Sequence, residues 1–136
     1  MPKVTKKTLN CRGRLVDLTQ PAIMGILNIT PDSFFADSRV SLDTTVSTAE
    51  RMLQEGATFL DIGGYSTRPG AAEVSPDEEA DRVLPSIEAI LAAFPDALIS
   101  VDTFRSSVAR QAVASGAALV NDIAGGTLDS AMFGTI

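Results

Sequence analysis

Residues 23–34 read Ile23-Met24-Gly25-Ile26-Leu27-Asn28-Ile29-Thr30-Pro31-Asp32-Ser33-Phe34. The apolar beginning of this stretch predicts a buried strand over roughly 22–27, which gives way to a turn after Asn28. Pro31 pushes the residue before it out of the helical region, and Asp32 and Ser33 favour turns through local side-chain hydrogen bonds. Polar groups just past a buried strand are where parallel α/β proteins carry their chemistry, so the stretch predicts a site as well as a strand.

The same design recurs three more times along the chain. Further buried strands are predicted over 58–62, 97–101 and 118–120, with helices over about 42–53, 75–93 and 106–115 and a short hairpin over 8–18. Ser75 and Pro76 give the second helix a cap and a first residue, and Gly56 and Gly116 are helix stops. Regular alternation of strand and helix with short loops predicts a parallel sheet with right-handed crossovers.

Polar residues at successive strand ends favour a parallel (β/α)8 TIM barrel over a doubly wound sheet, whose site lies at one switch point. The expected fold class is therefore α/β, with this chain supplying the hairpin and about four βα units of the barrel. A Rossmann sheet would require Gly-x-Gly-x-x-Gly after a strand, and Gly63-Gly64-Tyr65-Ser66 does not supply it.

Composition narrows the possible functions. The 136 residues allow one domain at most, and a net charge of −6 argues against binding to nucleic acid or to an anionic membrane. The chain has no histidine, which excludes imidazole acid–base catalysis and histidine-ligated zinc within it. Cys11 is the single cysteine, so an internal disulfide is excluded and a reducing cytoplasm is expected. No signal peptide or membrane-spanning run is recognisable.

The polar residues at the predicted strand ends are Asn28, Asp61, Asp102, Asn121 and Asp122. Any one of them could cap a helix or fix a turn, which is the commoner role for these residue types. As a set at one end of a barrel they would offer donors and acceptors to a flat nitrogen heterocycle. Asp102 is the natural clamp, because a carboxylate can accept two parallel hydrogen bonds, and the Asn121 amide is its natural partner.

The segment Ser66-Thr67-Arg68-Pro69-Gly70 has the opposite chemistry. Two hydroxyls and a guanidinium suit recognition of phosphate or carboxylate, although a solvated surface loop would look the same in isolation. The length of the loop and its position after a strand favour a function. Cys11 and Tyr65 are expected to be bystanders.

Taken together, these motifs resemble those of the dihydropteroate synthases, the folate-pathway targets of sulfonamides. The first signature corresponds to residues 24–34 and the second to 61–71, while 99–103 and 120–123 match the third and fourth strands of the family. Members of the family are TIM barrels that join 6-hydroxymethyl-7,8-dihydropterin diphosphate to p-aminobenzoate and release pyrophosphate with Mg²⁺. The resemblance therefore implies a transferase of folate biosynthesis that uses these two small molecules and magnesium.

The resemblance also implies roles for individual residues. Asp32 and Arg68 would be the catalytic residues, on two loops that close over the diphosphate and the incoming amine. Asn28 would help to hold Mg²⁺ and the diphosphate. Thr67, Asp102 and Asn121 would line the pterin pocket with Ile123 against the ring, and the other substrate-binding residues would be Phe34, Ser66 and Pro69. Loss of pyrophosphate followed by attack of a neutral aniline nitrogen needs charge stabilisation more than a strong base, which suits a chain without histidine.

Two departures from the family pattern matter. Tyr65 stands where many members carry Glu. Family barrels continue for four further βα units, so residues 1–136 are expected to be the N-terminal half of a pterin-binding barrel domain. This half alone is expected to be inactive and to form a homodimer or another self-associated species, because four strands leave two unpaired edges. The alternatives are a methyltetrahydrofolate methyltransferase-type domain, which should lack both loop motifs, and a non-catalytic pterin-binding fragment.

Overall fold

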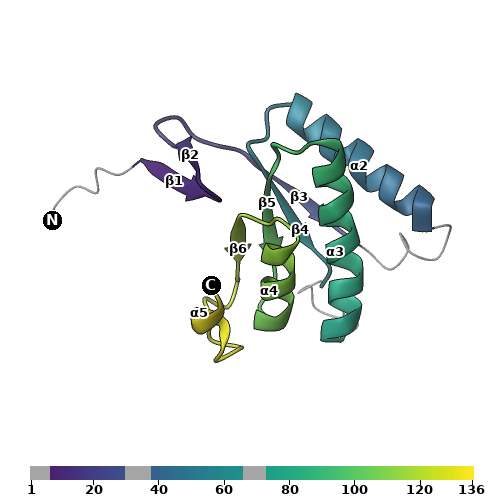
Figure 1. Ribbon diagram of the computed structural model, residues 1–136, viewed down its shortest axis with the longest axis vertical. Helices are drawn as coiled ribbons and strands as arrows, with labels where there is room; N and C mark the ends of the chain where they lie inside the picture. Colours follow the sequence, from purple (N-terminus) through teal and green to yellow (C-terminus); the bar gives the residue numbers. More distant parts are fainter. Residues whose placement is uncertain (1–6, 30–37, 66–72) are drawn as a thin grey trace, which may run out of the picture.

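A four-stranded parallel sheet forms the centre of the computed structural model, which describes residues 7–29, 38–65 and 73–136 (Figure 1). Its strands, in order across the sheet, are β3 (Met24–Asn28), β4 (Phe59–Gly63), β5 (Leu98–Asp102) and β6 (Leu119–Asn121). Each strand pairs in parallel with the strand that follows it in the chain. All four predicted strands are confirmed, with bounds shifted by one or two residues.

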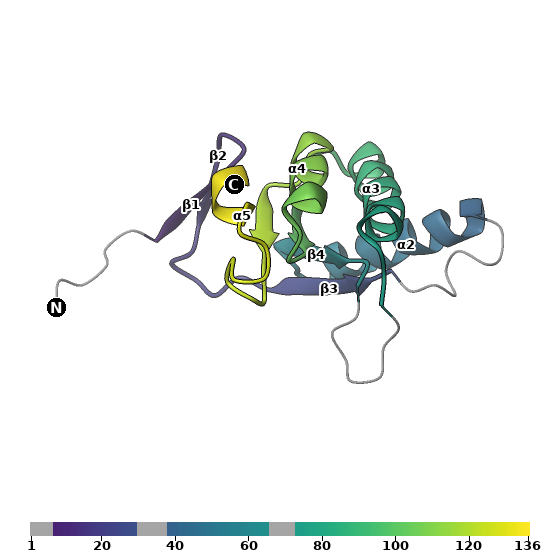
Figure 2. The same cartoon turned by 90° about the horizontal axis from the view of Figure 1, so that it is seen from below.

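The helices that connect these strands lie on one face of the sheet (Figures 1 and 2). They are α2 (Ser38–Gln54), α3 (Pro76–Ala93) and α4 (Ser106–Ala114), and a short α5 (Met132–Thr135) follows β6. A doubly wound sheet would reverse its strand order and carry helices on both faces, whereas steady progression with helices outside is the wall of a (β/α) barrel. In the described part of the chain, no helix has the length and apolar character needed to cross a membrane.

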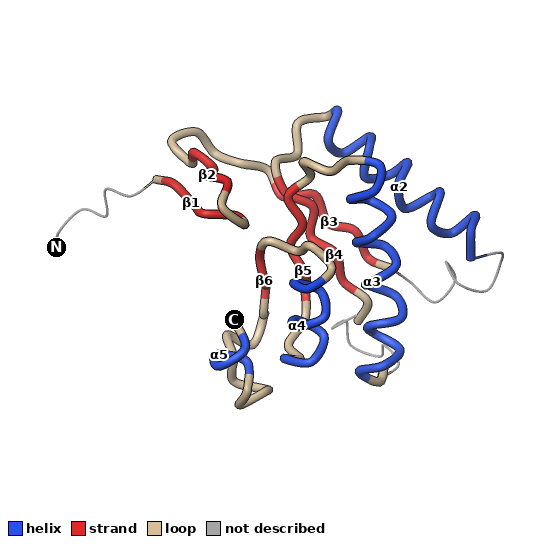
Figure 3. The backbone as a smooth tube through the Cα atoms, in the orientation of Figure 1, coloured by secondary structure: helices blue, strands red, loops and turns tan. Residues whose placement is uncertain are grey.

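The two faces of the sheet differ sharply in composition. Leu60 and Ile62 of β4 and Ile99 and Val101 of β5 are fully buried against the helices, in the main hydrophobic cluster. Side chains alternate along a strand, so the residues between them project to the opposite face. There Ile26 of the edge strand β3 keeps 62% of its surface exposed, whereas the residues of β4 and β5 on the same face are buried: Phe59, Asp61, Leu98 and Ser100. This second face is the inner face of a barrel, and the tube drawing in Figure 3 shows α2, α3 and α4 on the other side of the strands.

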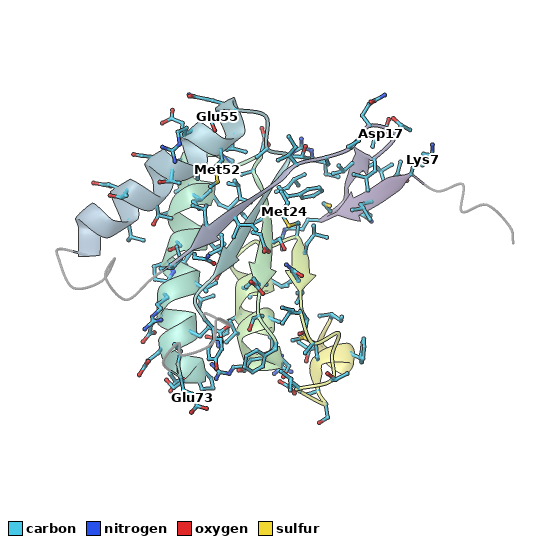
Figure 4. All side chains as sticks on the ribbon, turned by 180° about the vertical axis from the view of Figure 1, so that it is seen from behind. Lys7, Asp17, Met24, Met52, Glu55 and Glu73 are labelled. Carbon is cyan, nitrogen blue, oxygen red and sulfur yellow. The ribbon has the colours of Figure 1, made fainter. Side chains whose placement is uncertain are left out.

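A hairpin covers one end of the inner face. Its strands, β1 (Thr8–Cys11) and β2 (Arg14–Asp17), pair antiparallel as predicted. Cys11 is buried with Phe59 and Leu98, the first residues of β4 and β5. The hairpin therefore closes the amino ends of the strands, and it does not reach their carboxyl ends. Figure 4, seen from behind, shows the hairpin and Met24 of β3 from the side of the inner face.

The helix boundaries follow local chemistry. The Ser75 hydroxyl accepts a hydrogen bond from the backbone N–H of Glu78 at 3.1 Å, and Pro76 opens α3, as predicted. Gly56 and Gly116 follow α2 and α4 with φ of +109° and +118°, a conformation that side chains with a Cβ rarely adopt. The predicted starts and stops are confirmed at these positions.

The start of α4 is capped from a distance. Arg105 occupies the cap position without a capping side-chain bond, and the backbone N–H of Ser106 instead donates to Asp129 Oδ2 at 2.7 Å. The other oxygen of Asp129 accepts from the N–H of Ala131 at 2.9 Å. These bonds, that from Ser106 foremost, hold the pKa of Asp129 below its ordinary value. The segment after β6 is thereby tied to the helix before it.

Candidate active site

One cross-strand row carries three of the predicted site residues. The Cα register aligns Asn28 with Gly63, Gly63 with Asp102, and Asp102 with Asn121, each the last residue of its strand. Because the four strands are parallel, these residues share the carboxyl edge of the sheet. The structure thus brings Asn28, Asp102 and Asn121 together on the inner face, at the end that the hairpin leaves open.

Gly63 provides the space within this row. A Cβ at this position would lie 3.4 Å from Cβ and Oδ2 of Asp102 and 3.7 Å from Oδ1 of Asn28. The Asp102 carboxylate and the Asn28 amide oxygen therefore face one open space above Gly63. Asp102 is partly exposed, and Asn28 and Asn121 are exposed. The row offers solvent a carboxylate and two amides, arranged to meet a planar polar ligand.

The environment of Asp102 is unfavourable for a negative charge. The pKa of Asp102 is raised from 3.8 to about 6, and burial is the largest cause. The negative charges of Asp61, Glu79 and Asp122 are the smaller causes of the same shift. A ligand that presents N–H donors to this carboxylate would stabilise its charged form.

Asp102→Asn is expected to stabilise the fold at neutral pH. The folded state holds the Asp102 proton to higher pH than the unfolded state, so stability falls as pH rises from about 4 to about 6. One pKa unit corresponds to about 1.4 kcal/mol, and solvent screening of a partly exposed group reduces the expected gain to about 1 kcal/mol at pH 7.5. Denaturant unfolding of the protein expressed from its complete reading frame would measure this gain, which should be mostly lost at pH 4. A gain of equal size at both pH values, or one matched by Asp96→Asn at an exposed position, would contradict the assignment.

Asp122 and Ile123 differ from the rest of the predicted set. Both carboxylate oxygens of Asp122 are used by the following turn, accepting from the N–H groups of Ala124 and Gly126 at 2.8 Å each. The turn-fixing alternative is therefore the observed one for Asp122. Ile123 is 73% exposed beside the row, where a flat ring could cover it.

Asp61 lies inside β4 rather than at its end. It is 3% exposed, and its Oδ2 accepts a hydrogen bond from Nδ2 of Asn121 at 3.1 Å. Both residues belong to the predicted set of strand-end polar residues, but the sequence gives no sign that they touch, because 60 positions separate them. The contact lies directly beneath the row of strand ends.

A second cluster, which the sequence did not suggest, consists of an ion pair and two aromatic rings beside the strand ends. Arg105 Nη1 forms an ion pair of 2.9 Å with Oε1 of Glu79, which is 0% exposed. The guanidinium lies 5.2 Å from the ring centroid of Tyr65 and 4.9 Å from that of Phe104, and the two rings meet edge to face. Tyr65, expected to be a bystander, thus packs with residues of the loop after β5. Acidic residues early in a helix usually face solvent, so nothing in the sequence singled out Glu79 as buried.

The backbone just after β4, at Gly64, is held against α3. Arg82 Nη1 donates to the carbonyl oxygen of Gly64 at 3.1 Å. A Cβ on Gly64 would approach Cγ2 of Val83 to 3.0 Å and the carbonyl oxygen of Glu79 to 3.1 Å, so only glycine fits without a shift. The backbone before residue 66 is therefore fixed by contacts that any larger residue would disturb.

Six predicted site residues fall outside the described ranges: Asp32, Phe34, Ser66, Thr67, Arg68 and Pro69. Their roles stay predictions. Within the described ranges there is no group of three or more His, Cys, Asp or Glu side chains that could hold a metal ion. The predicted magnesium ligand Asn28 would contribute only a neutral amide oxygen.

Comparison with known proteins agrees with this geometry. A family model described as "Pterin binding enzyme" matches residues 24–136. The folic acid synthesis protein of Pneumocystis carinii is 53% identical over 114 residues, covering 84% of this chain and 15% of that protein. The dihydropteroate synthase of Escherichia coli K12 is 49% identical over 116 residues, covering 85% of this chain and 41% of the relative.

Solved structures that resemble this chain include dihydropteroate synthases. The dihydropteroate synthase of Xanthomonas albilineans with 4-aminobenzoic acid superposes with a TM-score of 0.82 at 44% identity, covering 93% of this chain and 47% of that one. The chain therefore belongs to the pterin-binding enzyme family, whose domain is a TIM barrel. Within that family its similarity is to the dihydropteroate synthases, and it spans less than half of the length of these relatives.

Proposed function

We propose that this chain carries part of the substrate site of a dihydropteroate synthase. The reaction would condense 6-hydroxymethyl-7,8-dihydropterin diphosphate with p-aminobenzoate and release pyrophosphate. The observation that carries the proposal is the row of Asn28, Asp102 and Asn121 at the open end of the inner face. Dihydropteroate synthases among its relatives, one of them solved with 4-aminobenzoic acid, support the choice of reaction.

Asp102 and Asn121 would recognise the pterin ring. A carboxylate accepts two parallel N–H bonds from a guanidine-like edge, and an amide beside it can both donate and accept. Burial makes the charged carboxylate unfavourable when it is empty, and paired N–H donors would relieve that cost. Ile123, exposed beside Asn121, would lie against the ring.

The two loop segments outside the described ranges would complete the site. Asp32 and Arg68 would act at the diphosphate and the incoming amine, where a guanidinium can stabilise the leaving pyrophosphate. The remaining proposed contacts are those of Ser66 and Thr67 with the pterin diphosphate, and of Phe34 and Pro69 with p-aminobenzoate.

Magnesium would be held mainly by the substrate. Mg²⁺ is commonly bound through one or two protein oxygens together with substrate phosphates and water. The Asn28 amide oxygen faces the space above Gly63, so one oxygen donor of the right kind is present there. A bound ion would offset the charge of the diphosphate, and the part of this chain would be to orient that group through Asn28.

The location and assembly of the protein are also proposals. Cys11 is a free, buried thiol, which suits the reducing cytoplasm. In the described sheet β3 and β6 each have one neighbour, and such edges pair readily with another chain. A polypeptide limited to residues 1–136 is therefore proposed to self-associate, as a homodimer or a larger species.

Steady-state formation of dihydropteroate tests the proposed function. The protein expressed from its complete reading frame should form dihydropteroate from the two substrates, whereas a polypeptide limited to residues 1–136 should form none. The shorter chain should also scatter light as a self-associated species, because its inner face and strand edges are exposed. Methyl transfer from methyltetrahydrofolate, or pterin binding without condensation, would contradict the proposed synthase activity. A compact, active monomer of residues 1–136 would reject the account of the open sheet.

A further inference from the structure

The bond between Asp61 and Asn121 crosses a strand. Asp61 lies on β4 and Asn121 on β6, and β5 separates these strands in the sheet. The bond therefore runs over the inner face of β5, from the second row of side chains up to the row of strand ends. Ser100 stands in register with Asp61 on β5, and its small side chain leaves this path open.

Asp61 has one carboxylate oxygen without a partner. Within the described residues, three buried side-chain oxygens have no hydrogen-bond partner: Oδ1 of Asp61, the hydroxyl of Ser100 and Oε2 of Glu79. Only those of Asp61 and Ser100 lie on the strands of the site. Both side chains project from the inner face, since the residues that alternate with them, Ile62 and Ile99, pack against the helices. A buried carboxylate oxygen without a partner lowers stability, so its place directly beneath the site points to a task there.

We propose that Asp61 is a positioning residue that holds the Asn121 amide in one orientation for the ligand. An asparagine amide can turn by 180°, which exchanges its donor and its acceptor at almost no change in shape. Oδ2 of Asp61 accepts from Nδ2 of Asn121, so Nδ2 faces Asp61 and Oδ1 of the amide is left to accept from the ligand. The inference rests on the proposed function, because pterin is the ligand that would meet this fixed amide.

The charge of Asp61 also acts on Asp102, the carboxylate proposed to bind the pterin ring together with Asn121. It is among the causes that raise the pKa of Asp102, which places the two carboxylates close enough to interact. Asp61 thus fixes the amide and makes the neighbouring carboxylate more dependent on N–H donors from a ligand. Both effects favour a ring edge with several donors over one with acceptors.

Selectivity between two related rings tests the proposal. Pterin and lumazine differ at C2, where the amino donor of pterin is a carbonyl acceptor in lumazine, and N1 beside it changes from an acceptor to an N–H donor. In the protein expressed from its complete reading frame, Asp61→Asn should weaken pterin binding about tenfold and narrow the preference for pterin over lumazine, because the Asn121 amide can then turn. Isothermal titration calorimetry with both rings measures this, with Asp96→Asn at an exposed position as the matched control. The KM for p-aminobenzoate should not change.

The outcomes separate the two claims. If the unaltered protein binds pterin and Asp61→Asn keeps the same preference over lumazine, the positioning role is wrong, whatever happens to stability. If the unaltered protein binds neither ring, the proposed function fails, and the inference that rests on it fails too.

A measurement on the unaltered protein tests the proposal even if the Asp61→Asn variant does not fold. Asn121 is exposed, so one slowly exchanging side-chain amide proton in the ligand-free protein would report the bond to Asp61. Asn10 is the internal reference, because it is exposed and, among the described residues, its only side-chain hydrogen bond is the one that Oδ1 accepts from Gly13 at 2.8 Å. Equal exchange of the two side-chain amides in NMR spectra would overturn the proposal.

Discussion

Asp102→Ala is expected to weaken pterin binding more than any other single substitution in the described part of the chain. The change leaves ring N–H donors without an acceptor in a partly buried site, at a cost of roughly 1–3 kcal/mol, or about 5- to 150-fold in Kd. The effect should be largest above pH 7, where the carboxylate is charged because its pKa is about 6. Calorimetry with pterin on the protein expressed from its complete reading frame measures it.

Asp96→Ala is the matched control, because Asp96 is an exposed carboxylate near the opposite end of β5. It should bind pterin as the unaltered protein does. An unchanged affinity for Asp102→Ala would reject the clamp, and equal losses for both variants would point to a general effect of charge.

Arg105→Ala should lower the free energy of unfolding by about 3–5 kcal/mol, because it leaves the fully buried Glu79 without its ion-pair partner. The rings of Tyr65 and Phe104 would also lose their contact with the guanidinium. Denaturant unfolding at pH 7.5 gives the difference, with the exposed Arg110→Ala as the control.

A second substitution separates the ion pair from the loss of packing. Adding Glu79→Gln to Arg105→Ala removes the unpaired charge and should recover a large part of the loss. If the single variant costs less than about 1 kcal/mol, or the added Glu79→Gln makes it worse, the buried pair does not stabilise the protein as described.

The features that could be predicted from the sequence are those set by neighbours along the chain. Ser75 and Glu78 are three positions apart, and Gly56 lies two positions after the last residue of α2, so local rules were sufficient. The row of Asn28, Asp102 and Asn121 was also predictable, because parallel strands bring their carboxyl ends to one edge. The roles assigned to Asp32 and Arg68 stay predictions, since they lie outside the described ranges.

What could not be predicted depends on register between distant segments. The sequence marks Asp61 as a polar residue near a strand end, yet its depth in β4 and its contact with Asn121 follow from the pairing of three strands. Glu79 has the appearance of an ordinary acidic residue in the first turn of a helix. Its burial depends on Arg105, 26 positions away, which only the folded sheet brings within reach.

The distant cap of α4 has a consequence for the order in which this protein is made. Asp129, which binds the first N–H of that helix, is 23 residues further along the chain than Ser106. At about 5–20 residues per second, the ribosome delivers this carboxylate roughly 1–5 s after the helix start it completes. During that interval the first turn of α4 lacks its acceptor, so a nascent chain acquires the third βα unit in full only after the fourth strand has been synthesised.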